Sequence, residues 1–335
     1  MARHAADLPE ELGEVFTLAE AVQAGVSPQR LRRRDIRSLF RGVYERVAAD
    51  HESASGQGDS VVSEESTHVP PRWQVEHLER AKAFSRMMRG KPWFFSGVTA
   101  ALIWGMPIPS GRFDQLEIGV YAPQRPPERR GVRGVQVRTE LADVQERRGV
   151  RLTSPASTWV MLGSRLPLRD LVACGDALIH RDRIPGTNRL GRPPMATLEE
   201  LCGEVARGRR RGVRLLRAAL PLLRTGSASP PETHTRLLLR DAGLPEPELD
   251  YDVFGSVGQF LGCSEIAFPD PRVALEYESE HHRVSRHQWN RDIEKYRAYA
   301  EVGWQVVRVT SELLYRRPRE LIRQVRGVLH CRPHC

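Results

Sequence analysis

The sequence predicts a multidomain α/β (α+β) protein made of three units in series. Three observations predict it: an acidic stretch rich in Ser and Gly follows the first fifty residues, a second break occurs at "TGSASPP", and helical and strand periodicities are mixed around that break. The expected units are residues 1–49, a linker at 50–70, a middle mixed α/β region at 71–226 and a C-terminal region at 227–335. A chain of 335 residues is long enough for several cores, although a single compact fold is also compatible with this length.

Positive charge dominates the composition. The formal net charge is +9 and the isoelectric point is near 9.7. Lysine occurs only at Lys82, Lys91 and Lys295, so nearly all of the positive charge is arginine. Because the planar guanidinium group recognises phosphate and guanine, double-stranded DNA is the first partner to consider. The alternative is a GC-rich genome that encodes Arg in place of Lys.

Several classes of protein are disfavoured by the sequence. It has no run of about twenty apolar residues, and "MARHAADLPEELGE" lacks the apolar core of a signal peptide. We therefore expect a soluble, cytoplasmic protein that makes no membrane contact. The five cysteines are scattered and do not describe a disulfide framework. The tail "HCRPHC" groups two His and two Cys residues, but no second ligand pair stands elsewhere at zinc-site spacing.

The first unit is expected to form a helix, a tight glycine turn, a second helix and a short strand pair. In "FTLAEAVQAGVSPQRLRRRDI", Thr17 and Glu20 stand at capping-box spacing, and Ser27 followed by Pro28 predicts the start of the second helix. "SLFRGVYERVA" then alternates like two strands that turn at Gly42. The second helix carries Arg30, Arg32, Arg33 and Arg34.

The linker and the middle region carry weaker functional signals. The linker contains acids, Ser and Gly but no Arg or Lys, so it cannot bury enough apolar surface to order itself. The middle region begins with helical and strand patterns and continues with helices. It shows no catalytic constellation. Its basic run at residues 207–217 is interpreted as the solvated face of a helix rather than as a DNA contact.

The third unit has a clear order of elements. Helix "PETHTRLLLRDAGLP" is capped by Ser229 and stopped by Gly243, and three strands follow it in "LDYDVFG", "GQFLGCSEIAF" and "RVALEYES". A helix, the strand "WQVVRVT" and a last helix complete the chain. This order predicts a sheet flanked by helices on both faces.

Carboxylates gather on the strands of this unit. Glu276 and Glu278 lie two residues apart and therefore point to the same face. An even-length loop at "PDPR" would place Glu265 of the preceding strand on that face, whereas an odd-length loop would turn it away. A Mg²⁺ ion held by Glu265, Glu276 and Glu278 would relieve the repulsion between them and activate water against a phosphodiester.

Other ionisable residues stand close in sequence. Glu232 on the capped helix is a fourth candidate acid, and Arg236 one turn later is expected to pair with it or to hold a phosphate. His281 and His282 follow the second strand, where a general acid or base could protonate the leaving oxygen. The alternative is that the acids mark the solvent face of an edge strand and that the histidines are ordinary loop residues.

At these residues the chain resembles a known family. The segment from Ser229 to Leu329 is similar to the very-short-patch-repair-like branch of the PD-(D/E)XK endonucleases, through "PPETHTRLLLRDAGLPEP", "EIAFPDPRVALEYESEHH" and "RDIEKYRAYAEVGWQVVRVT". The resemblance implies a restriction-endonuclease-like sheet flanked by helices and metal-dependent cleavage of DNA. It places the functional residues of the family on Glu232, Glu265, Glu276, Glu278, His282 and Asp292.

The chain departs from this family at two acids. The family usually has Asp where Glu265 stands, and Asp-Gly where this chain has Glu278-Ser279. Each additional methylene moves a carboxylate by roughly 1.5 Å, against a tolerance of about 0.5 Å for a productive site. These departures leave open whether the domain cleaves DNA or keeps only the fold.

The first unit resembles a second family. "FTLAEAVQAGVSPQRLRR" and "LFRGVYERV" are similar to the N-terminal winged helix-turn-helix of AbiEi-type antitoxins from abortive-infection systems. The resemblance implies operator binding, with the helix at Pro28 to Asp35 in the major groove and the wing near Arg41 on the DNA backbone. The alternative is a small helical domain with a solvated basic face.

Two main functions follow from these predictions. The first is a DNA-binding protein whose C-terminal domain is a Mg²⁺-dependent endonuclease in defence or repair. The second is an antitoxin-like transcriptional regulator whose nuclease-like domain is inactive. A third class is a module that neutralises a cognate toxin through protein contacts. The sequence predicts neither the DNA target nor the oligomeric state.

Overall fold

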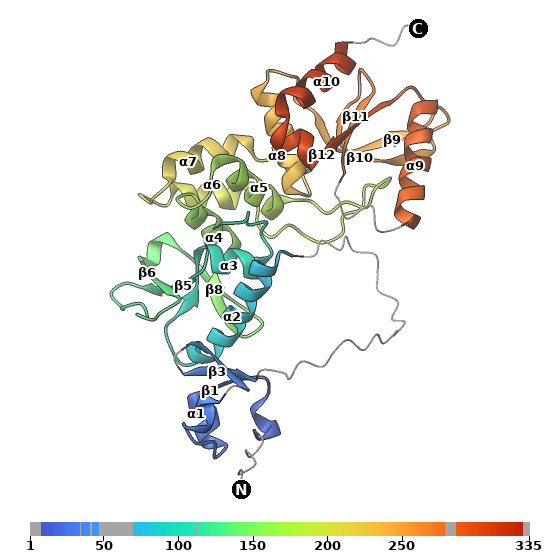
Figure 1. Ribbon diagram of the computed structural model, residues 1–335. Helices are drawn as coiled ribbons and strands as arrows, with labels where there is room; N and C mark the ends of the chain where they lie inside the picture. Colours follow the sequence, from blue (N-terminus) through green and yellow to red (C-terminus); the bar gives the residue numbers. More distant parts are fainter. Residues whose placement is uncertain are drawn as a thin grey trace. The chain divides into compact units, whose positions relative to one another are not determined.

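The computed structural model describes residues 8–33, 35–40, 42–46, 70–111, 113–278 and 286–330 (Figure 1). Arg34, Arg41, His281, His282, the linker up to residue 69 and residues 331–335 lie outside this described part. The chain divides into two compact units. The first comprises Met1–Ile103 and Gly111–Ser154, and the second comprises Trp104–Ser110 and Pro155–Cys335.

The first unit begins with a small antiparallel sheet and one short helix. Its elements are β1 (Val15–Thr17), α1 (Leu18–Gln23), β2 (Ile36–Phe40) and β3 (Val43–Arg46), with strand order β1-β3-β2. The predicted capping box is present: the Glu20 N–H donates to Thr17 Oγ1 at 3.2 Å, and the Thr17 N–H donates to Glu20 Oε2 at 2.7 Å. The predicted strand pair is the hairpin β2–β3, with Gly42 at φ +88° in its turn.

The predicted second helix is shorter than the sequence pattern indicates. Ser27 does accept the Arg30 N–H at 3.4 Å, as an N-cap would, but only a 3-10 turn at Arg30–Arg32 follows. Arg33 is extended, with ψ 160°, because Ile36 has to begin β2 and is buried in the same core as Leu31. The expected helix from Pro28 to Asp35 is therefore reduced to a single 3-10 turn.

The rest of the first unit is a five-stranded mixed sheet with helices. Its order is β6-β5-β4-β8-β7, in which the pairs β5–β6 and β4–β8 are parallel and the pairs β4–β5 and β7–β8 are antiparallel. The elements are α2 (Arg72–Met88), β4 (Phe94–Phe95), α3 (Gly97–Trp104), β5 (Leu116–Tyr121), β6 (Val132–Val137), β7 (Val144–Arg147) and β8 (Val150–Thr153).

The start of α3 requires glycine. Gly97 has φ +51°, and a Cβ atom there would lie 1.7 Å from Oε2 of Glu117. That buried carboxylate accepts the Val98 N–H at 3.3 Å and pairs with Arg133 at 3.0 Å. A side-chain carboxylate from β5 thus satisfies one backbone donor in the first turn of the helix, as the positive end of a helix dipole favours.

The second unit contains helices followed by the C-terminal sheet. The helices before the sheet are α4 (Pro155–Leu162), α5 (Leu168–Ile179), α6 (Leu198–Ala206), α7 (Val213–Ala219) and α8 (Pro230–Asp241). The remaining elements are β9 (Glu248–Phe254), β10 (Phe260–Phe268), β11 (Val273–Glu278), α9 (Arg286–Glu301), β12 (Gln305–Thr310) and α10 (Pro318–His330). From α8 onward this is the predicted order of a helix, three strands, a helix, a strand and a helix.

The C-terminal sheet buries both of its faces. Its order is β12-β11-β10-β9; β11 and β12 are parallel, and the other neighbours are antiparallel. Ile266 and Leu275 lie on the face that packs with Leu321 and Val325 of α10. Ala267 and Ala274 lie on the opposite face, together with Tyr299 of α9. In Figure 1, α9 accordingly lies on one side of this sheet, while α8 and α10 lie on the other.

The division into units does not follow the predicted boundary at residues 226–227. The strands of the middle region belong to the first unit, whereas its helices α4 to α7 form one unit with the C-terminal sheet. A buried ion pair explains this association: Arg236 of α8 donates to Asp176 of α5 at 3.0 Å, and both side chains are almost completely buried. None of the described helices is long and apolar enough to span a lipid bilayer.

Candidate active site

Two glutamates lie on neighbouring strands of the C-terminal sheet. The four-residue loop Pro269 to Arg272 joins β10 to β11, and the register pairs Ile266 with Leu275 and Ala267 with Ala274. Glu265 and Glu276 are the next residues on the two strands beyond Ile266 and Leu275, where this register ends. The loop has even length, so strand alternation predicts that both carboxylates share a face, and the ion pair with Lys295 places Glu276 on the face that carries α9.

Glu276 is buried and is paired with a lysine. Glu276 is only 6% exposed, and its Oε1 lies 2.9 Å from Nζ of Lys295 on α9. Burial raises the pKa of Glu276 above its ordinary value, although the ion pair with Lys295 acts in the opposite direction. The Lys295 ammonium also lies 5.5 Å from the centre of the Tyr299 ring. The lysine is therefore fixed beside the carboxylate.

Glu265 is held by the backbone of the neighbouring strand. Its Oε2 accepts the Tyr277 N–H at 2.8 Å. Burial, followed by repulsion from Glu232 and Glu276, raises the pKa of Glu265 well above its ordinary value. Three carboxylates are thus close enough to influence one another's protonation.

Glu232 is placed by the first turn of α8. Glu232 is only 5% exposed. Its N–H donates to Ser229 Oγ at 3.4 Å, and its Oε2 accepts the Ala228 N–H at 2.8 Å. Burial, together with repulsion from Glu276 and Asp250, raises the pKa of Glu232 to about 7. A carboxyl group with this pKa can exchange a proton near neutral pH.

The prediction that Arg236 pairs with Glu232 or holds a phosphate is wrong. Arg236 is completely buried, donates to Asp176 at 3.0 Å and to the Leu222 carbonyl at 2.8 Å, and so cannot reach a ligand. The helical spacing of the two residues is correct. Arg236 pairs with Asp176 of α5, sixty positions earlier in the chain, and not with Glu232.

Glu278 is drawn away from the other acids. Alternation along β11 puts it on the same face as Glu276, but its Oε1 lies 2.6 Å from Nε of Arg308 on β12 and accepts a hydrogen bond from Tyr296 at 3.3 Å. His282 lies outside the described residues. Asp292 on α9 is near enough to contribute to the raised pKa of Glu276.

The donor set fits part of a Mg²⁺ site. The described residues contain no group of three or more His, Cys, Asp or Glu side chains placed to hold a metal ion. Mg²⁺, however, is commonly held by one or two carboxylates together with water and substrate phosphate. Glu265 and Glu276 would supply such a pair of oxygen donors. Burial is the main cause of their raised pKa values, and repulsion from neighbouring carboxylates adds to it. Glu278, engaged by Arg308, does not fit this role in the same conformation.

Lys295 is the site residue that sequence reasoning missed. It lies nineteen positions after Glu276, on a helix whose rotation about its axis the sequence does not determine. A signal was nevertheless present, since Lys295 is one of three lysines in a chain that otherwise uses arginine. Where arginine supplies nearly all of the positive charge, a lysine that follows a predicted pair of acids is a reasonable candidate for a site residue.

The predicted DNA-binding arginines differ in their availability. Arg30 is engaged, because its guanidinium donates to both oxygens of Asp35 at 2.9 and 2.6 Å. Arg32 and Arg33 are exposed. Arg34 and Arg41 lie outside the described residues. Arg32 and Arg33 are thus the described members of the predicted set that are best placed to meet a phosphate.

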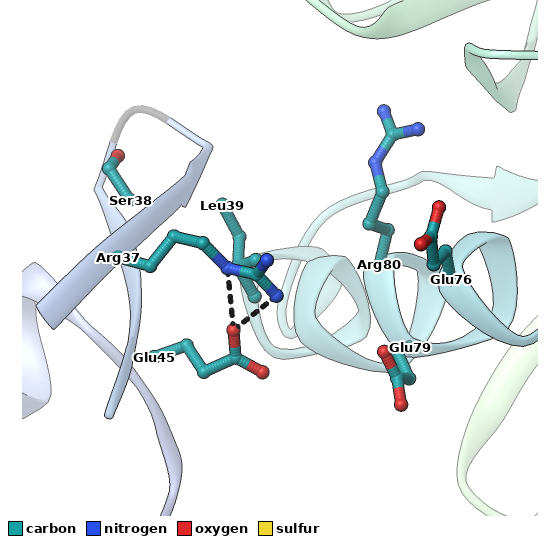
Figure 2. Close-up of a pocket in the computed structure, with 7 residues that line it drawn as sticks. All are labelled: Arg37, Ser38, Leu39, Glu45, Glu76, Glu79 and Arg80. Atoms are coloured by element: carbon teal, nitrogen blue, oxygen red, sulfur yellow. Dashed lines mark hydrogen bonds and ion pairs between the residues drawn. The ribbon is translucent and has the colours of Figure 1, made fainter. Parts of the chain in front are cut away.

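A recess of about 190 Å³ lies in the first unit between the β2–β3 hairpin and α2 (Figure 2). Figure 2 shows Arg37 donating twice to Glu45, at 2.9 and 2.7 Å, with Glu76, Glu79 and Arg80 on the side of α2. Because carboxylates line both sides, this recess does not suit a phosphate. It supports no function of its own.

The raised pKa of Glu232 predicts a pH-dependent stability. The unfolded carboxyl ionises near 4.5 and the folded one near 7, so the folded state holds an extra proton between these values and loses stability as the pH rises through them. We expect this effect to be about 3 kcal/mol, at about 1.4 kcal/mol per pKa unit. Denaturant unfolding without divalent cations, compared between the protein and Glu232→Gln from pH 4.5 to 7.5, measures it. Parallel pH profiles would contradict the assignment.

Fold and site define a mixed α/β protein with two carboxylates on neighbouring strands of its C-terminal sheet and a lysine from α9 beside one of them. No family model matches the chain. It is similar to "Uncharacterized protein Rv2248" of Mycobacterium tuberculosis (strain ATCC 25618 / H37Rv) and to "Uncharacterized protein MT2308" of strain CDC 1551 / Oshkosh. Each is 30% identical over 202 residues, which cover 57% of this chain and 70% of the relative. The chain belongs to the same family as these mycobacterial proteins.

One solved structure is also similar, the "Crystal structure of RV2827C protein from Mycobacterium tuberculosis". It is 16% identical with a TM-score of 0.36, and the match covers 75% of this chain and 85% of that one. A similarity of this size supports no structural or functional conclusion.

Proposed function

We propose that this chain binds double-stranded DNA and that its C-terminal sheet carries the site of a Mg²⁺-dependent endonuclease. The observation that best supports this proposal is the pair formed by Glu265 and Glu276 on adjacent strands, with Lys295 fixed 2.9 Å from Glu276. The order of elements and the sheet flanked by helices agree with the resemblance to very-short-patch-repair-like nucleases of the PD-(D/E)XK superfamily.

Each described residue has a role in this proposal. Glu265 and Glu276 would hold Mg²⁺, which when bound polarises a phosphodiester and lowers the pKa of water. Lys295 would stabilise negative charge that develops on the phosphate, because its ammonium is already fixed at the site. Glu232, with a pKa of about 7, would accept a proton from the attacking water near neutral pH.

Nicking of supercoiled plasmid tests the enzymatic part of the proposal. The full chain is expected to convert supercoiled DNA to open circles with Mg²⁺ or Mn²⁺ and to be inactive with EDTA. A Glu276→Ala protein is the matched control for contaminating nucleases, because both proteins pass through the same purification. Equal conversion, or equal inactivity, of the two proteins would rule out the nuclease function.

One observation favours the second function, an antitoxin-like transcriptional regulator with an inactive nuclease-like domain. Glu278, where the nuclease family usually has Asp, is held by Arg308 at 2.6 Å and Tyr296 at 3.3 Å. An acid held in this way no longer needs a metal ion to balance its charge. DNA binding with a steep salt dependence but without nicking would identify this function, whereas weak, salt-insensitive DNA binding would favour a module for a cognate toxin.

We further propose that residues 1–49 bind an operator in the manner of a winged helix-turn-helix, with the 3-10 turn at Arg30–Arg32 in the place of the expected recognition helix. Replacing Arg32 and Arg33 together by Ala is expected to weaken DNA binding and to lower the salt slope by about one for each phosphate that is no longer neutralised. The exposed pair Arg72 and Arg89 of the same unit provides a control of equal charge change. Gel-shift titration of both double variants measures the effect. Unchanged affinity of the Arg32/Arg33 variant would remove the assignment.

A further inference from the structure

A short hairpin arm connects α5 to α6 and reaches the C-terminal sheet. We define the arm as residues 181–192; in Figure 1 it is the yellow-green segment that leaves the end of α5 and extends toward β9 and β10. Arg183 and Leu190 form an antiparallel bridge, and the Thr187 N–H donates to the Ile184 carbonyl at 3.1 Å. Pro185 and Gly186, the latter at φ +73°, fit the central positions of a type II turn. The arm therefore has a defined shape.

Arg183 anchors the arm to the sheet. Its Nε lies 2.9 Å from Asp250 Oδ2, and its Nη2 donates to the Asp250 carbonyl at 2.7 Å and to Asp252 Oδ1 at 2.9 Å. The side chains of Arg183, Asp250 and Asp252 are only 20%, 25% and 16% exposed. Such a multidentate, largely buried arginine fixes orientation as well as position.

The anchor lies one strand away from the carboxylate pair. Ser264 pairs with Tyr251 and Ile266 pairs with Leu249, so Glu265 and Asp250 occupy the positions between them on β10 and β9. Arg183 thus neutralises the acids of β9 and holds the arm against the strand that neighbours Glu265.

The arm presents positive charge to solvent. It contains four arginines and one acid, Asp182. Arg183 is used by the anchor, and Arg192 lies 3.7 Å from Asp182. The remaining two, Arg181 and Arg189, are exposed. An acidic site repels a polyanionic substrate, so a fixed cationic element beside it compensates for part of that repulsion.

We propose that the arm is a nucleic-acid contact in which Arg181 and Arg189 bind backbone phosphates that flank the carboxylate pair. This inference rests on the proposed function, because it says that the substrate of the carboxylate site is a nucleic acid that extends beyond the phosphate being cleaved. Each arginine neutralises one phosphate and contributes to affinity irrespective of base sequence.

The test measures DNA binding and not cleavage. Fluorescence anisotropy of the full chain with a labelled duplex of arbitrary sequence, in EDTA and across about 50 to 200 mM salt, gives the slope of log Kd against log salt. The double variant R181Q/R189Q is expected to lower this slope by about two, at about 0.9 per phosphate contact. R214Q/R217Q, in which two exposed arginines of the 207–217 run are replaced, is the matched control, and its slope should stay near that of the unaltered chain.

The outcomes separate this proposal from the nuclease proposal. A lower slope in the arm variant alone supports the arm, whether or not the chain nicks plasmid. Equal slopes in all three proteins, equal decreases in both double variants, or the absence of measurable duplex binding would each overturn it. Full DNA affinity of the arm variant combined with loss of binding to an acidic protein would also overturn it and would assign the arm to a protein partner.

Discussion

Replacing Glu276 by Gln is expected to lower the rate of plasmid nicking by at least about a hundredfold, the lower end of what a catalytic acid, base or metal ligand contributes. Glu276 lies on β11, the neighbour of the strand that carries Glu265; it is 6% exposed and holds Lys295 at 2.9 Å. The amide keeps the shape of the side chain but removes the charge that would attract Mg²⁺ and orient the lysine.

Two further variants make the Glu276 prediction specific. Glu294→Gln changes an exposed glutamate of α9 in the same way and should leave the nicking rate unchanged. Lys295→Met should lower the rate while leaving the Mn²⁺ concentration required for half-maximal activity nearly constant, because the lysine would act on the phosphate and not on the metal. A nicking rate for Glu276→Gln equal to that of Glu294→Gln would contradict the site.

Replacing Arg236 by Met is expected to destabilise the second unit by about 3–5 kcal/mol, the usual cost of removing one member of a buried ion pair. Asp176, 1% exposed, accepts hydrogen bonds from Arg236 at 3.0 Å, from Thr233 at 2.9 Å and from the Arg224 N–H at 2.7 Å. Without the guanidinium its charge would remain buried with only neutral donors.

Hydrogen exchange of peptides from α5 and α8 measures this effect locally, which suits a chain with two compact units that need not unfold together. Arg240→Met alters an exposed arginine one turn further along the same helix and should change the opening free energy by less than about 0.5 kcal/mol. Similar exchange in both variants would show that the Asp176–Arg236 pair does not stabilise the unit.

Local sequence patterns predicted local structure well. Thr17 and Glu20 form the expected capping box, Ser229 caps α8, and the loop after Phe268 has the even length of one of the two predicted alternatives. Each of these features depends on residues within a few positions of one another, or on the strict alternation of a strand.

The features that the sequence did not predict depend on distant contacts. The helix expected after Ser27 is cut to a 3-10 turn by the burial of Ile36, and Arg236 binds an acid sixty positions away rather than its helical neighbour Glu232. Arg183 likewise reaches Asp250 across 67 positions. Periodicity and capping rules describe only residues close in sequence. They can therefore identify candidate residues but not the distant residues that these side chains contact.

We propose that Glu265 and Glu276 together form a divalent-cation site. Calorimetric titration of Mn²⁺ into the full chain at pH 8, compared with Glu265→Gln and Glu276→Gln, tests for this site. We expect a binding isotherm for the unaltered chain that either substitution removes, with weaker binding at pH 6 because the carboxylates must lose their protons first. Identical isotherms for all three proteins would contradict it.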